Sequence, residues 1–238
     1  SLAHHITKTN YQSFLYMILT TQISEVHNED CMIGMARYPD KWFDLAVVDP
    51  PYGIGINTEK ASVIANKSKN PTHKKLNWDN SPPETQYFNE LIRVSKEQII
   101  WGGNHFLDVL GFCKAPIIWN KLNGDSMYAD GEFAWTSIGL PKNLRIFSHQ
   151  WCGAFKASER GSINIHPTQK PVALYDWIYK NYLPQGGKVI DTHLGSGSNR
   201  IAANKAGNID FVGFELDKDY YEAQEKRWKG FIAQTRLF

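Results

Sequence analysis

The stretch Val47-Val48-Asp49-Pro50-Pro51-Tyr52 constrains this 238-residue chain more than any other feature. The apolar run at residues 45–48 predicts a short buried strand, and the two prolines end it because each fixes φ and lacks an N–H donor. The loop then offers a carboxylate from Asp49, a carbonyl from Pro50 and a flat aromatic surface from Tyr52. These groups suit a planar amine whose N–H donors lie in its ring plane. A plain strand-ending turn is the alternative that these few residues leave open.

Composition limits the class of protein. The chain is long enough for one domain with a substantial core, and its formal net charge of +2 requires any basic surface to be local. Cys31, Cys113 and Cys152 form no C-x-x-C pair, which argues against a disulfide framework or a zinc knuckle. The apolar stretches are too short to span a membrane, and no signal peptide opens the sequence. We therefore expect a protein of the reducing cytoplasm.

Strand and helix patterns alternate along the chain, which predicts an α/β fold. Apolar runs indicate strands near residues 24–32, 45–48, 98–101, 115–119, 188–191 and 211–215. Helical spacing indicates helices near residues 83–95, 172–183, 201–207 and 219–229. Residues 11–21 fit either a strand or a short helix.

Asp30 ends the first predicted strand, one α/β unit before Asp49. It can serve as a plain N-cap for a short helix over residues 33–38. It also lies where open parallel sheets bind their ligands, beyond the carboxyl end of a strand. Both interpretations fit the sequence.

A lysine-rich segment follows the proline loop. Residues 60–75 include no acid, and their five lysines are Lys60, Lys67, Lys69, Lys74 and Lys75. A solvated loop is one interpretation of this composition. Because the segment directly follows Asp49–Tyr52, a phosphate-facing loop at about residues 56–80 is the other.

Residues 120–165 have weak periodicity, several glycines and many aromatic residues. Basic residues are interleaved with the rings, and a nucleic-acid surface needs cations for phosphates and rings for bases. One interpretation is a target-recognition insertion with Arg145 as a candidate DNA contact, and the other is a satellite packing region. In either case we expect a single domain over residues 1–238.

The last third predicts a βαβ unit with a glycine-rich first turn at residues 192–198 and an acid, Glu215, after its second strand. Gly195 and Gly197 let the backbone approach a ligand, and Glu215 is placed to accept hydrogen bonds from ribose hydroxyls. A dinucleotide fingerprint would need glycine where Arg200 stands, and no Walker lysine is present. A ligand with ribose and no phosphate remains, which indicates S-adenosylmethionine.

With these motifs in order, the chain resembles the amino-methyltransferases of DNA, which methylate adenine N6 or cytosine N4. Residues 49–52 match their Asp-Pro-Pro-Tyr motif, and residues 191–198 resemble their Asp-x-Phe-x-Gly-Ser-Gly-Thr cofactor motif. Residues 165–171 are similar to the segment that precedes this motif in the permuted, β-type subgroup. The resemblance runs from about residue 23 to 230. Thr192 and His193 depart from the usual Pro and Phe, so we expect an altered wall beside the methionine moiety.

The resemblance implies a Rossmann-like S-adenosylmethionine-dependent methyltransferase fold, with a seven-stranded mixed sheet, helices on both faces and permuted order. Residues 28–31 are similar to a family segment that places an acid near the cofactor adenine. The implied cofactor-binding residues are Asp30, Lys170, Asp191, Gly195, Ser196, Gly197 and Glu215. The implied catalytic residues are Asp49, Pro50 and Tyr52, and no metal is needed.

In the implied mechanism the target base leaves the DNA duplex and stacks on Tyr52. Asp49 and the Pro50 carbonyl accept hydrogen bonds from the amine and direct its lone pair toward the methyl group. The implied partner is double-stranded DNA. A second copy of the chain and a cognate restriction nuclease are further partners that the sequence leaves open.

Asp49 favours adenine as the target base, because cytosine-N4 enzymes usually resemble Ser-Pro-Pro-Tyr at this loop. A protein-glutamine or RNA methyltransferase is disfavoured because its cofactor turn normally precedes its catalytic loop. Intact Asp49, Tyr52 and Glu215 argue against a non-catalytic DNA-binding relative. His193, in place of the usual Phe, is the one residue that favours this alternative. We therefore predict a site-specific adenine-N6 DNA methyltransferase, with a cytosine-N4 enzyme as the alternative.

Overall fold

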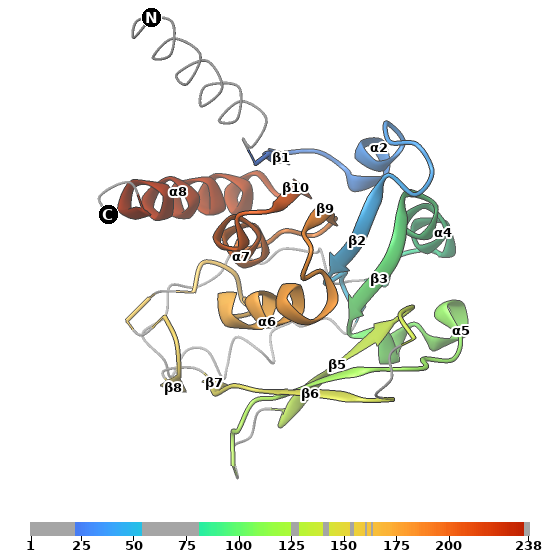
Figure 1. Ribbon diagram of the computed structural model, residues 1–238, viewed down its shortest axis with the longest axis horizontal. Helices are drawn as coiled ribbons and strands as arrows, with labels where there is room; N and C mark the ends of the chain where they lie inside the picture. The colour runs from blue at the N-terminus through green and yellow to red at the C-terminus, as the bar shows by residue number, and fades with distance from the viewer. Residues whose placement is uncertain are drawn as a thin grey trace, which may run out of the picture.

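The computed structural model of the protein describes residues 22–53, 81–124, 129–139, 143–152, 155–159, 161–162 and 164–235. They form an α/β structure around one eight-stranded sheet with the strand order β1-β10-β9-β2-β3-β5-β4-β6 (Figure 1). The strands of this sheet are β1 (Ser24–His27), β2 (Phe43–Val48), β3 (Ser95–Trp101), β4 (Ile117–Asn120), β5 (Gly131–Thr136), β6 (Arg145–Ser148), β9 (Gly187–Asp191) and β10 (Ile209–Phe214). A separate two-stranded sheet pairs β7 (Trp151–Cys152) with β8 (Phe155–Lys156).

Helices lie between most of these strands in the chain. They are α2 (Cys31–Met35), α4 (Thr85–Val94), α5 (Leu107–Leu110), α6 (Val172–Tyr182), α7 (Ser198–Ala206) and α8 (Lys218–Thr235), and a 3-10 turn, η2 (Gly103–His105), precedes α5. The helices predicted near residues 83–95, 172–183, 201–207 and 219–229 correspond to α4, α6, α7 and α8, and the short helix predicted over residues 33–38 corresponds to α2, which begins two residues earlier. Helix α7 starts three residues earlier than its apolar spacing indicated, because Gly197 in the left-handed conformation serves as its N-cap.

The sheet is mixed, as predicted. Strands β1, β10, β9, β2 and β3 run parallel, β5 is antiparallel to β3 and β4, and β6 is parallel to β4. The chain leaves β9 toward β10 on one side and leaves β2 toward β3 on the other, so the strand order reverses between β9 and β2. Open α/β sheets bind ligands at such a reversal, beyond the carboxyl ends of the strands.

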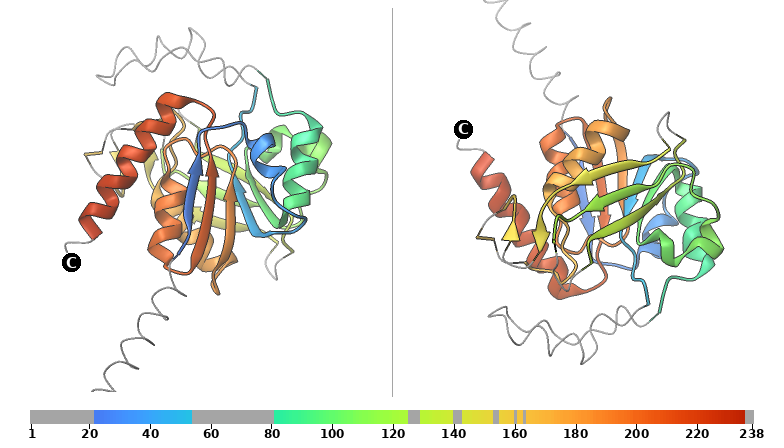
Figure 2. Two further views of the ribbon diagram at one scale, coloured as in Figure 1. Left: turned by 90° about the horizontal axis from the view of Figure 1, so that it is seen from above. Right: turned by 90° about the horizontal axis from the view of Figure 1, so that it is seen from below.

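The central strands are buried on both faces. Leu45 and Val47 of β2 face the core that the sheet shares with α6 and α7, whereas Ala46 and Val48 face the core shared with α2 and α4. Figure 2 shows these helix layers on opposite sides of the sheet. Burial on both faces explains why β2 is a continuous apolar run rather than an alternating one.

The sheet has eight strands rather than the expected seven. Strands β5 and β6 come from residues 120–165, the segment expected to be an insertion, and both join the main sheet. The periodicity of β6 is weak because it is an edge strand, in which Arg145 and Phe147 are half-buried and Ile146 and Ser148 are exposed. Recognition of a DNA sequence by this segment stays a prediction.

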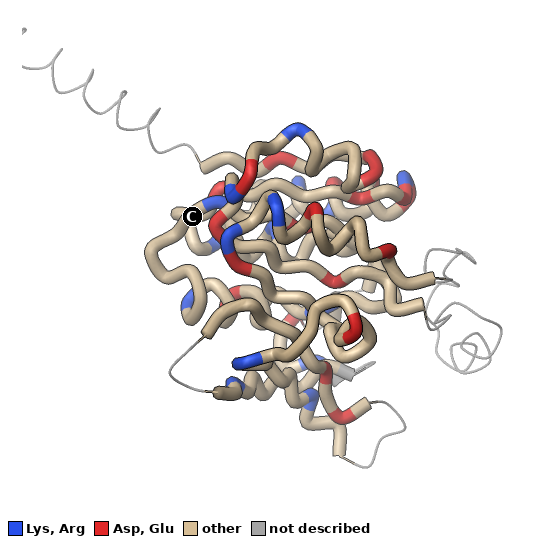
Figure 3. Tube along the Cα trace, turned by 90° about the vertical axis from the view of Figure 1, so that its right-hand side faces the viewer, with Lys and Arg blue, Asp and Glu red and all other residues tan. Residues whose placement is uncertain are grey.

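The predicted DNA-facing loop at residues 56–80 lies outside the described residues. Along the visible trace in Figure 3, Lys and Arg positions are interspersed with Asp and Glu positions, in keeping with the small formal net charge of +2. Among the helices of the described ranges, none combines the length and the apolar character that a membrane crossing requires.

Candidate active site

The four acids indicated by the sequence come from four parallel strands of one sheet. Asp30 and Asp49 lie just after β1 and β2, Asp191 is the last residue of β9, and Glu215 follows β10. Because parallel strands direct their carboxyl ends to the same edge, the topology gathers these acids at the strand-order reversal.

A cavity of about 870 Å³ opens at this edge of the sheet, and we call it the first cavity. Its lining includes five of the predicted cofactor-binding residues, namely Asp30, Lys170, Gly195, Ser196 and Glu215. Asp49 borders it as well. The volume suits a small organic ligand, since ligand pockets typically measure about 300–1,000 Å³.

The glycine-rich turn between β9 and α7 forms one wall of the first cavity. Gly195 has φ +54°, in the left-handed region that favours glycine. The Glu215 carboxylate holds the turn, because its Oε2 accepts from the Gly195 N–H at 2.8 Å and its Oε1 accepts from the Asp217 N–H at 2.9 Å. Burial raises the pKa of Glu215. Each oxygen retains a second lone pair, so Glu215 can also accept from the hydroxyls of a ligand.

Asp191 precedes this turn and Gly197 lies near its end. Neither is among the described residues that line the first cavity. Asp191 accepts from the His193 N–H at 3.1 Å and from Asn199 Nδ2 at 2.9 Å. Burial raises the pKa of Asp191 to about 7. A Cβ on Gly197 would come within 3.2 Å of Gln224. Both residues shape the turn, and their direct contact with a cofactor stays a prediction.

Asp30 has both features that the sequence suggested for it. Its carboxylate caps α2 by accepting from the Met32 N–H at 2.7 Å. The same residue lines the first cavity. The N-cap therefore fixes an acid in the lining of the first cavity.

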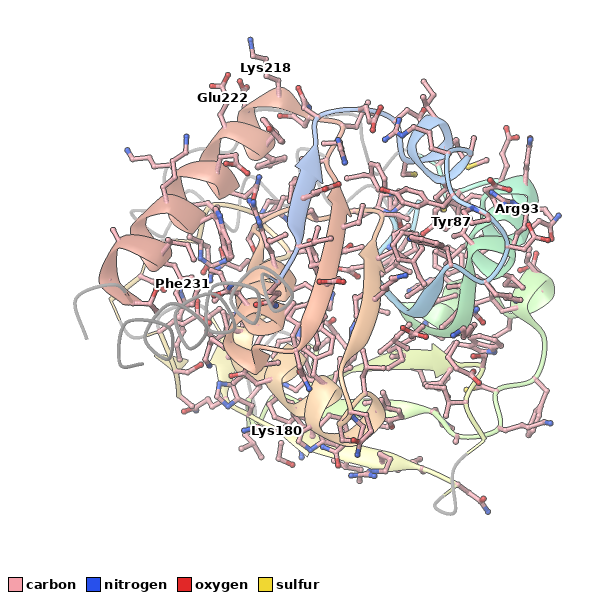
Figure 4. The ribbon with its side chains drawn as sticks, turned by 45° about the horizontal axis from the view of Figure 1, so that its top comes forward. Tyr87, Arg93, Lys180, Lys218, Glu222 and Phe231 are labelled. Atoms are coloured by element: carbon pink, nitrogen blue, oxygen red, sulfur yellow. The ribbon has the colours of Figure 1, made fainter. Side chains whose placement is uncertain are left out.

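Thr192 and His193, the two departures from the family motif, form a polar wall with Tyr87 of α4. Thr192 Oγ1 lies 2.6 Å from the Tyr87 hydroxyl and 2.9 Å from His193 Nδ1. Tyr87, labelled in Figure 4, also contacts the His193 ring edge-on at 5.4 Å. Burial lowers the pKa of His193 to about 4, so this wall is uncharged at neutral pH. The sequence did not single out Tyr87, because its helical spacing fits an ordinary core residue.

Two further residues without a sequence signal hold the glycine-rich turn. Arg227 of α8 donates to the Ser196 carbonyl at 2.8 Å, to Ser198 Oγ at 2.9 Å and to Glu159 at 2.6 Å. Glu159 in turn accepts from the Val172 N–H, at the start of α6, at 2.9 Å. These bonds tie the turn to residues that lie far away in the sequence.

Asp49 lies at the centre of a cluster of polar side chains. The Tyr52 hydroxyl donates to Asp49 Oδ1 at 2.5 Å, and Lys170 Nζ donates to Oδ2 at 2.5 Å. Lys170 also pairs with Glu132 at 3.1 Å, and Glu132 pairs with Lys121 at 2.6 Å. Burial alone would lower the pKa of Lys170, but the two carboxylates raise it above its ordinary value. Lys170, expected to bind the cofactor, thus has its ammonium on the predicted catalytic acid.

A second cavity, of about 610 Å³, adjoins the first. Its lining includes several aromatic side chains: Tyr52, His105, Trp119, Phe133 and Trp151. Thr168, Gln169 and Lys170 line both cavities. Asp49 borders the first cavity and Tyr52 the second, so the two cavities meet at the cluster around Asp49.

Tyr52 is held in a defined position. Its ring stacks on His105 with centroids 5.0 Å apart and an angle of 14° between the planes. A Cβ on Gly102, which has φ +66°, would come within 2.1 Å of the Tyr52 ring, so only glycine leaves room there. Burial raises the pKa of Tyr52 well above its ordinary value, which keeps the hydroxyl protonated as a donor to Asp49. Pro50, between the two residues, is buried.

Of the predicted DNA-contact residues, only Arg145 lies among the described residues. Arg145 of β6 lies over the rings of Trp177 and Tyr182, at 5.3 and 5.9 Å, and donates to Asn181. These contacts hold Arg145 against α6, and a role in DNA binding stays a prediction. The five lysines Lys60, Lys67, Lys69, Lys74 and Lys75 lie outside the described residues.

The described residues offer no metal-binding cluster, and they include two free thiols. Within the described ranges, no three His, Cys, Asp or Glu side chains are grouped so that they could hold a metal ion. Cys31 and Cys113 are free thiols. Burial raises the pKa of Cys31 to about 12, so this thiol is protonated at neutral pH.

Comparison with known proteins supports the resemblance to the amino-methyltransferases of DNA. A family model described as DNA methylase, covering N6 and N4 methyltransferases, matches residues 137–226. The type II methyltransferase M2.DpnII of Streptococcus pneumoniae is 30% identical over 244 residues, which cover 85% of this chain and 88% of that protein. This relative is similar over nearly the whole length of both chains.

Solved structures share the fold. The M1.HpyAVI–SAM complex matches with a TM-score of 0.52 at 17% identity, over 86% of this chain and 98% of that one. The cytosine-N4-specific PvuII DNA methyltransferase matches with a TM-score of 0.52 at 13% identity, over 87% of each chain. The predicted methyltransferase fold is thereby confirmed. Together with the similarity to M2.DpnII, these findings show that the chain belongs to the amino-methyltransferases of DNA, the adenine-N6 and cytosine-N4 family.

Proposed function

We propose that this protein transfers a methyl group from S-adenosylmethionine to the N6 amine of an adenine flipped out of duplex DNA. The observation that carries the proposal is the meeting of two cavities at Asp49. One cavity is bordered by the glycine-rich turn and Glu215, and the other is lined by Tyr52 and further aromatic rings. A reaction between a nucleoside cofactor and a planar base needs this arrangement.

The residues of the first cavity fit S-adenosylmethionine. Glu215 offers lone pairs for ribose hydroxyls, and Gly195 leaves the backbone open to close approach. The polar wall of Tyr87, Thr192 and His193 is neutral at neutral pH, so it does not repel a cationic sulfonium. Bound S-adenosylmethionine would supply an electrophilic methyl group. The amine nitrogen would form a C–N bond as the S–C bond breaks, S-adenosylhomocysteine would leave with the S–C electron pair, and the amine would release one proton to solvent.

Asp49 would polarise the target amine. Its two oxygens already accept one hydrogen bond each, from Tyr52 and Lys170, and each oxygen retains a further lone pair. An amine N–H that binds there draws the nitrogen lone pair out of conjugation with the ring, which makes the nitrogen more nucleophilic. This preorganised acceptor acts through position and electrostatics.

The second cavity would receive the flipped base. Inside a duplex the amine is paired and stacked, so an enzyme that acts on it extrudes the nucleotide and replaces the lost stacking with its own rings. Tyr52, which is half-buried, and His105, which is exposed, supply such rings. Double-stranded DNA is the proposed partner, and homodimer formation and a cognate restriction nuclease stay predictions of the resemblance.

Cytosine N4 is the second candidate target. The PvuII enzyme, whose fold this chain shares, is cytosine-N4-specific, so the fold is compatible with cytosine as the target. The carboxylate of Asp49 supports adenine, because cytosine-N4 enzymes usually have serine at that position of the loop.

The experiment is methylation of unmodified duplex DNA with S-adenosylmethionine, followed by digestion and mass spectrometry of the nucleosides. We expect N6-methyladenine, in a defined sequence context when the same DNA is sequenced with long reads. N4-methylcytosine would overturn the choice of base and keep the family assignment. Unmodified DNA, with a protein that binds the cofactor in calorimetry, would contradict the proposed activity on DNA.

A further inference from the structure

A buried lysine links the predicted catalytic acid to a strand outside every recognised motif. Lys170 is 4% exposed, and lysine is almost never buried to this degree unless it is paired. Its Nζ lies 2.5 Å from Asp49 Oδ2 and 3.1 Å from Glu132 Oε2. Glu132 belongs to β5, whereas Asp49 follows β2.

The segment that carries Lys170 is fixed by its neighbours. Trp151 Nε1 donates to the Gln169 carbonyl at 2.9 Å, and Gln169 Oε1 accepts from the Ile165 N–H at 3.1 Å. Gln169 is itself buried. The backbone next to Lys170 is therefore anchored, and its ammonium is placed by the protein rather than by solvent.

Charges alternate through the cluster. Lys121 pairs with Glu132, Glu132 with Lys170, and Lys170 with Asp49. Two ammonium groups and two carboxylates leave the set formally neutral. The balance matters because Lys170 lines both cavities, so an uncompensated ammonium there would repel a cationic ligand in the first cavity.

We infer that Lys170 and Glu132 form a positioning pair for the methyl-transfer reaction, in which Lys170 orients the Asp49 carboxylate while Glu132 cancels the charge that Lys170 would otherwise present to the sulfonium. This inference rests on the proposed function, because it assigns Asp49 the role of acceptor for the target amine. It adds Glu132 to the active site, although the sequence pattern placed that residue in a recognition insertion.

The first test is Lys170→Met, which removes the ammonium and keeps an unbranched side chain. Asp49 would then face Glu132 without a cation between them, so a proton would bind it more tightly. We expect kcat to fall roughly tenfold or more and the acid limb of the pH–rate profile to move up by about one pH unit. The other charged or titratable groups around this cluster are Tyr52, Lys121, Tyr175 and Asp191. An unmoved acid limb would overturn the role of Lys170.

The second test is Glu132→Gln, measured by calorimetry without DNA. Removing this carboxylate leaves the Lys170 charge undercompensated beside the first cavity. Affinity for the cationic S-adenosylmethionine should therefore fall about fivefold, while affinity for the uncharged thioether product S-adenosylhomocysteine changes less than about twofold. Equal losses for the two ligands would show a merely structural role and overturn the charge argument.

Separate control variants distinguish an effect on folding from an effect on charge compensation. The double variant Lys170→Met with Glu132→Gln removes one charge of each sign, so it should fold and recover the wild-type ratio of the two affinities. Lys205→Met, at the distant pair with Asp176, is the matched control for loss of a paired lysine and should change neither readout. A double variant that keeps the ratio of Glu132→Gln would overturn the inference. The ratio of the two affinities is measured without DNA. A failure of the inference can therefore be distinguished from a failure of the proposed function, which would show as wild-type protein that does not methylate DNA.

Discussion

The two cavities that meet at Asp49 are built in different ways. The first lies at the carboxyl ends of parallel strands, and its walls are short contiguous stretches such as the glycine-rich turn and the Asp30 cap. The second is lined from the antiparallel part of the sheet and the loops beyond it, by residues such as Trp119, Glu132 and Trp151. Short contiguous stretches thus form much of the wall of the first cavity, with Tyr87 and Arg227 holding them, whereas side chains from separate strands and loops form the second.

The charged groups around the first cavity also differ from those at the junction of the two cavities. Around the first, burial raises the pKa of Glu215 and lowers that of His193 to about 4, so desolvation dominates. Between the two, Lys170 and Glu132 keep their charges because each pairs with an opposite charge. Outside the shared cluster of Asp49, Lys170 and Glu132, variants of the first cavity should therefore change cofactor binding, and variants of the second should change the reaction with DNA.

The largest expected effect belongs to Asp49→Ala, at the junction of the cavities. Loss of the acceptor is felt in the transition state, so we expect methylation to fall by about 10²–10³-fold or more. Affinity for S-adenosylmethionine should fall only about fivefold, as in Glu132→Gln, because Lys170 loses one of its two carboxylate partners while the turn and Glu215 are untouched. Asp49→Asn is the matched variant, because it keeps one acceptor oxygen and should lose less. Strong methylation by Asp49→Ala would remove the centre of the proposed mechanism.

The next effect concerns Tyr52, which lines only the second cavity of the two. Stacking alone would leave Tyr52→Phe fully active, but the hydroxyl donates to Asp49 at 2.5 Å. We expect Tyr52→Phe to lose about tenfold in kcat through that bond. Tyr52→Ala should lose more, because base stacking on a ring contributes roughly 1–3 kcal/mol. Cofactor affinity, measured in parallel, should be unchanged in both variants, and a loss there would break the division between the cavities.

Glu215→Ala tests the first cavity. The substitution removes the acceptor for ribose hydroxyls and the bond that holds the Gly195 N–H. Binding of S-adenosylmethionine should weaken by roughly 1–3 kcal/mol in calorimetry, while DNA affinity by itself stays unchanged. Glu97→Ala is the control, since Glu97 is exposed near the start of β3 and belongs to the lining of neither cavity. Unchanged cofactor affinity in Glu215→Ala would remove this residue from the site.

The same division explains how much the sequence could predict. The order of strands and helices, the α/β class and the residues at the strand ends followed from apolar runs and glycine-rich turns. Strand β6 and its place in the main sheet did not, because an edge strand buries little and gives a weak pattern. Lys170 was recognisable as part of a motif, but its partner Glu132 was not, because a pair formed across two distant strands leaves no spacing in the sequence.

The smallest expected effect is a pH dependence of stability that originates behind the first cavity. Burial raises the pKa of Asp191 to about 7, from an ordinary value of 3.8. Between these values the folded state holds a proton that the unfolded state has released, so this group favours folding at low pH and loses that contribution as pH rises toward 7. His193 acts in the opposite direction, because its folded pKa of about 4 lies below the ordinary 6.5.

The two contributions separate by substitution. In urea unfolding of the cofactor-free protein between about pH 4.5 and 7, Asp191→Asn should remove a decline in the unfolding free energy of roughly 3 kcal/mol, which the opposing His193 contribution largely offsets in the wild type. His193→Phe should remove the opposing rise and leave a steeper decline with pH. Tyr52→Phe, at the second cavity, serves as the control and should keep the wild-type slope, because its hydroxyl stays protonated throughout this range. An Asp191→Asn slope equal to that of the wild type would place the Asp191 pKa near its ordinary value, and desolvation would then no longer distinguish the first cavity.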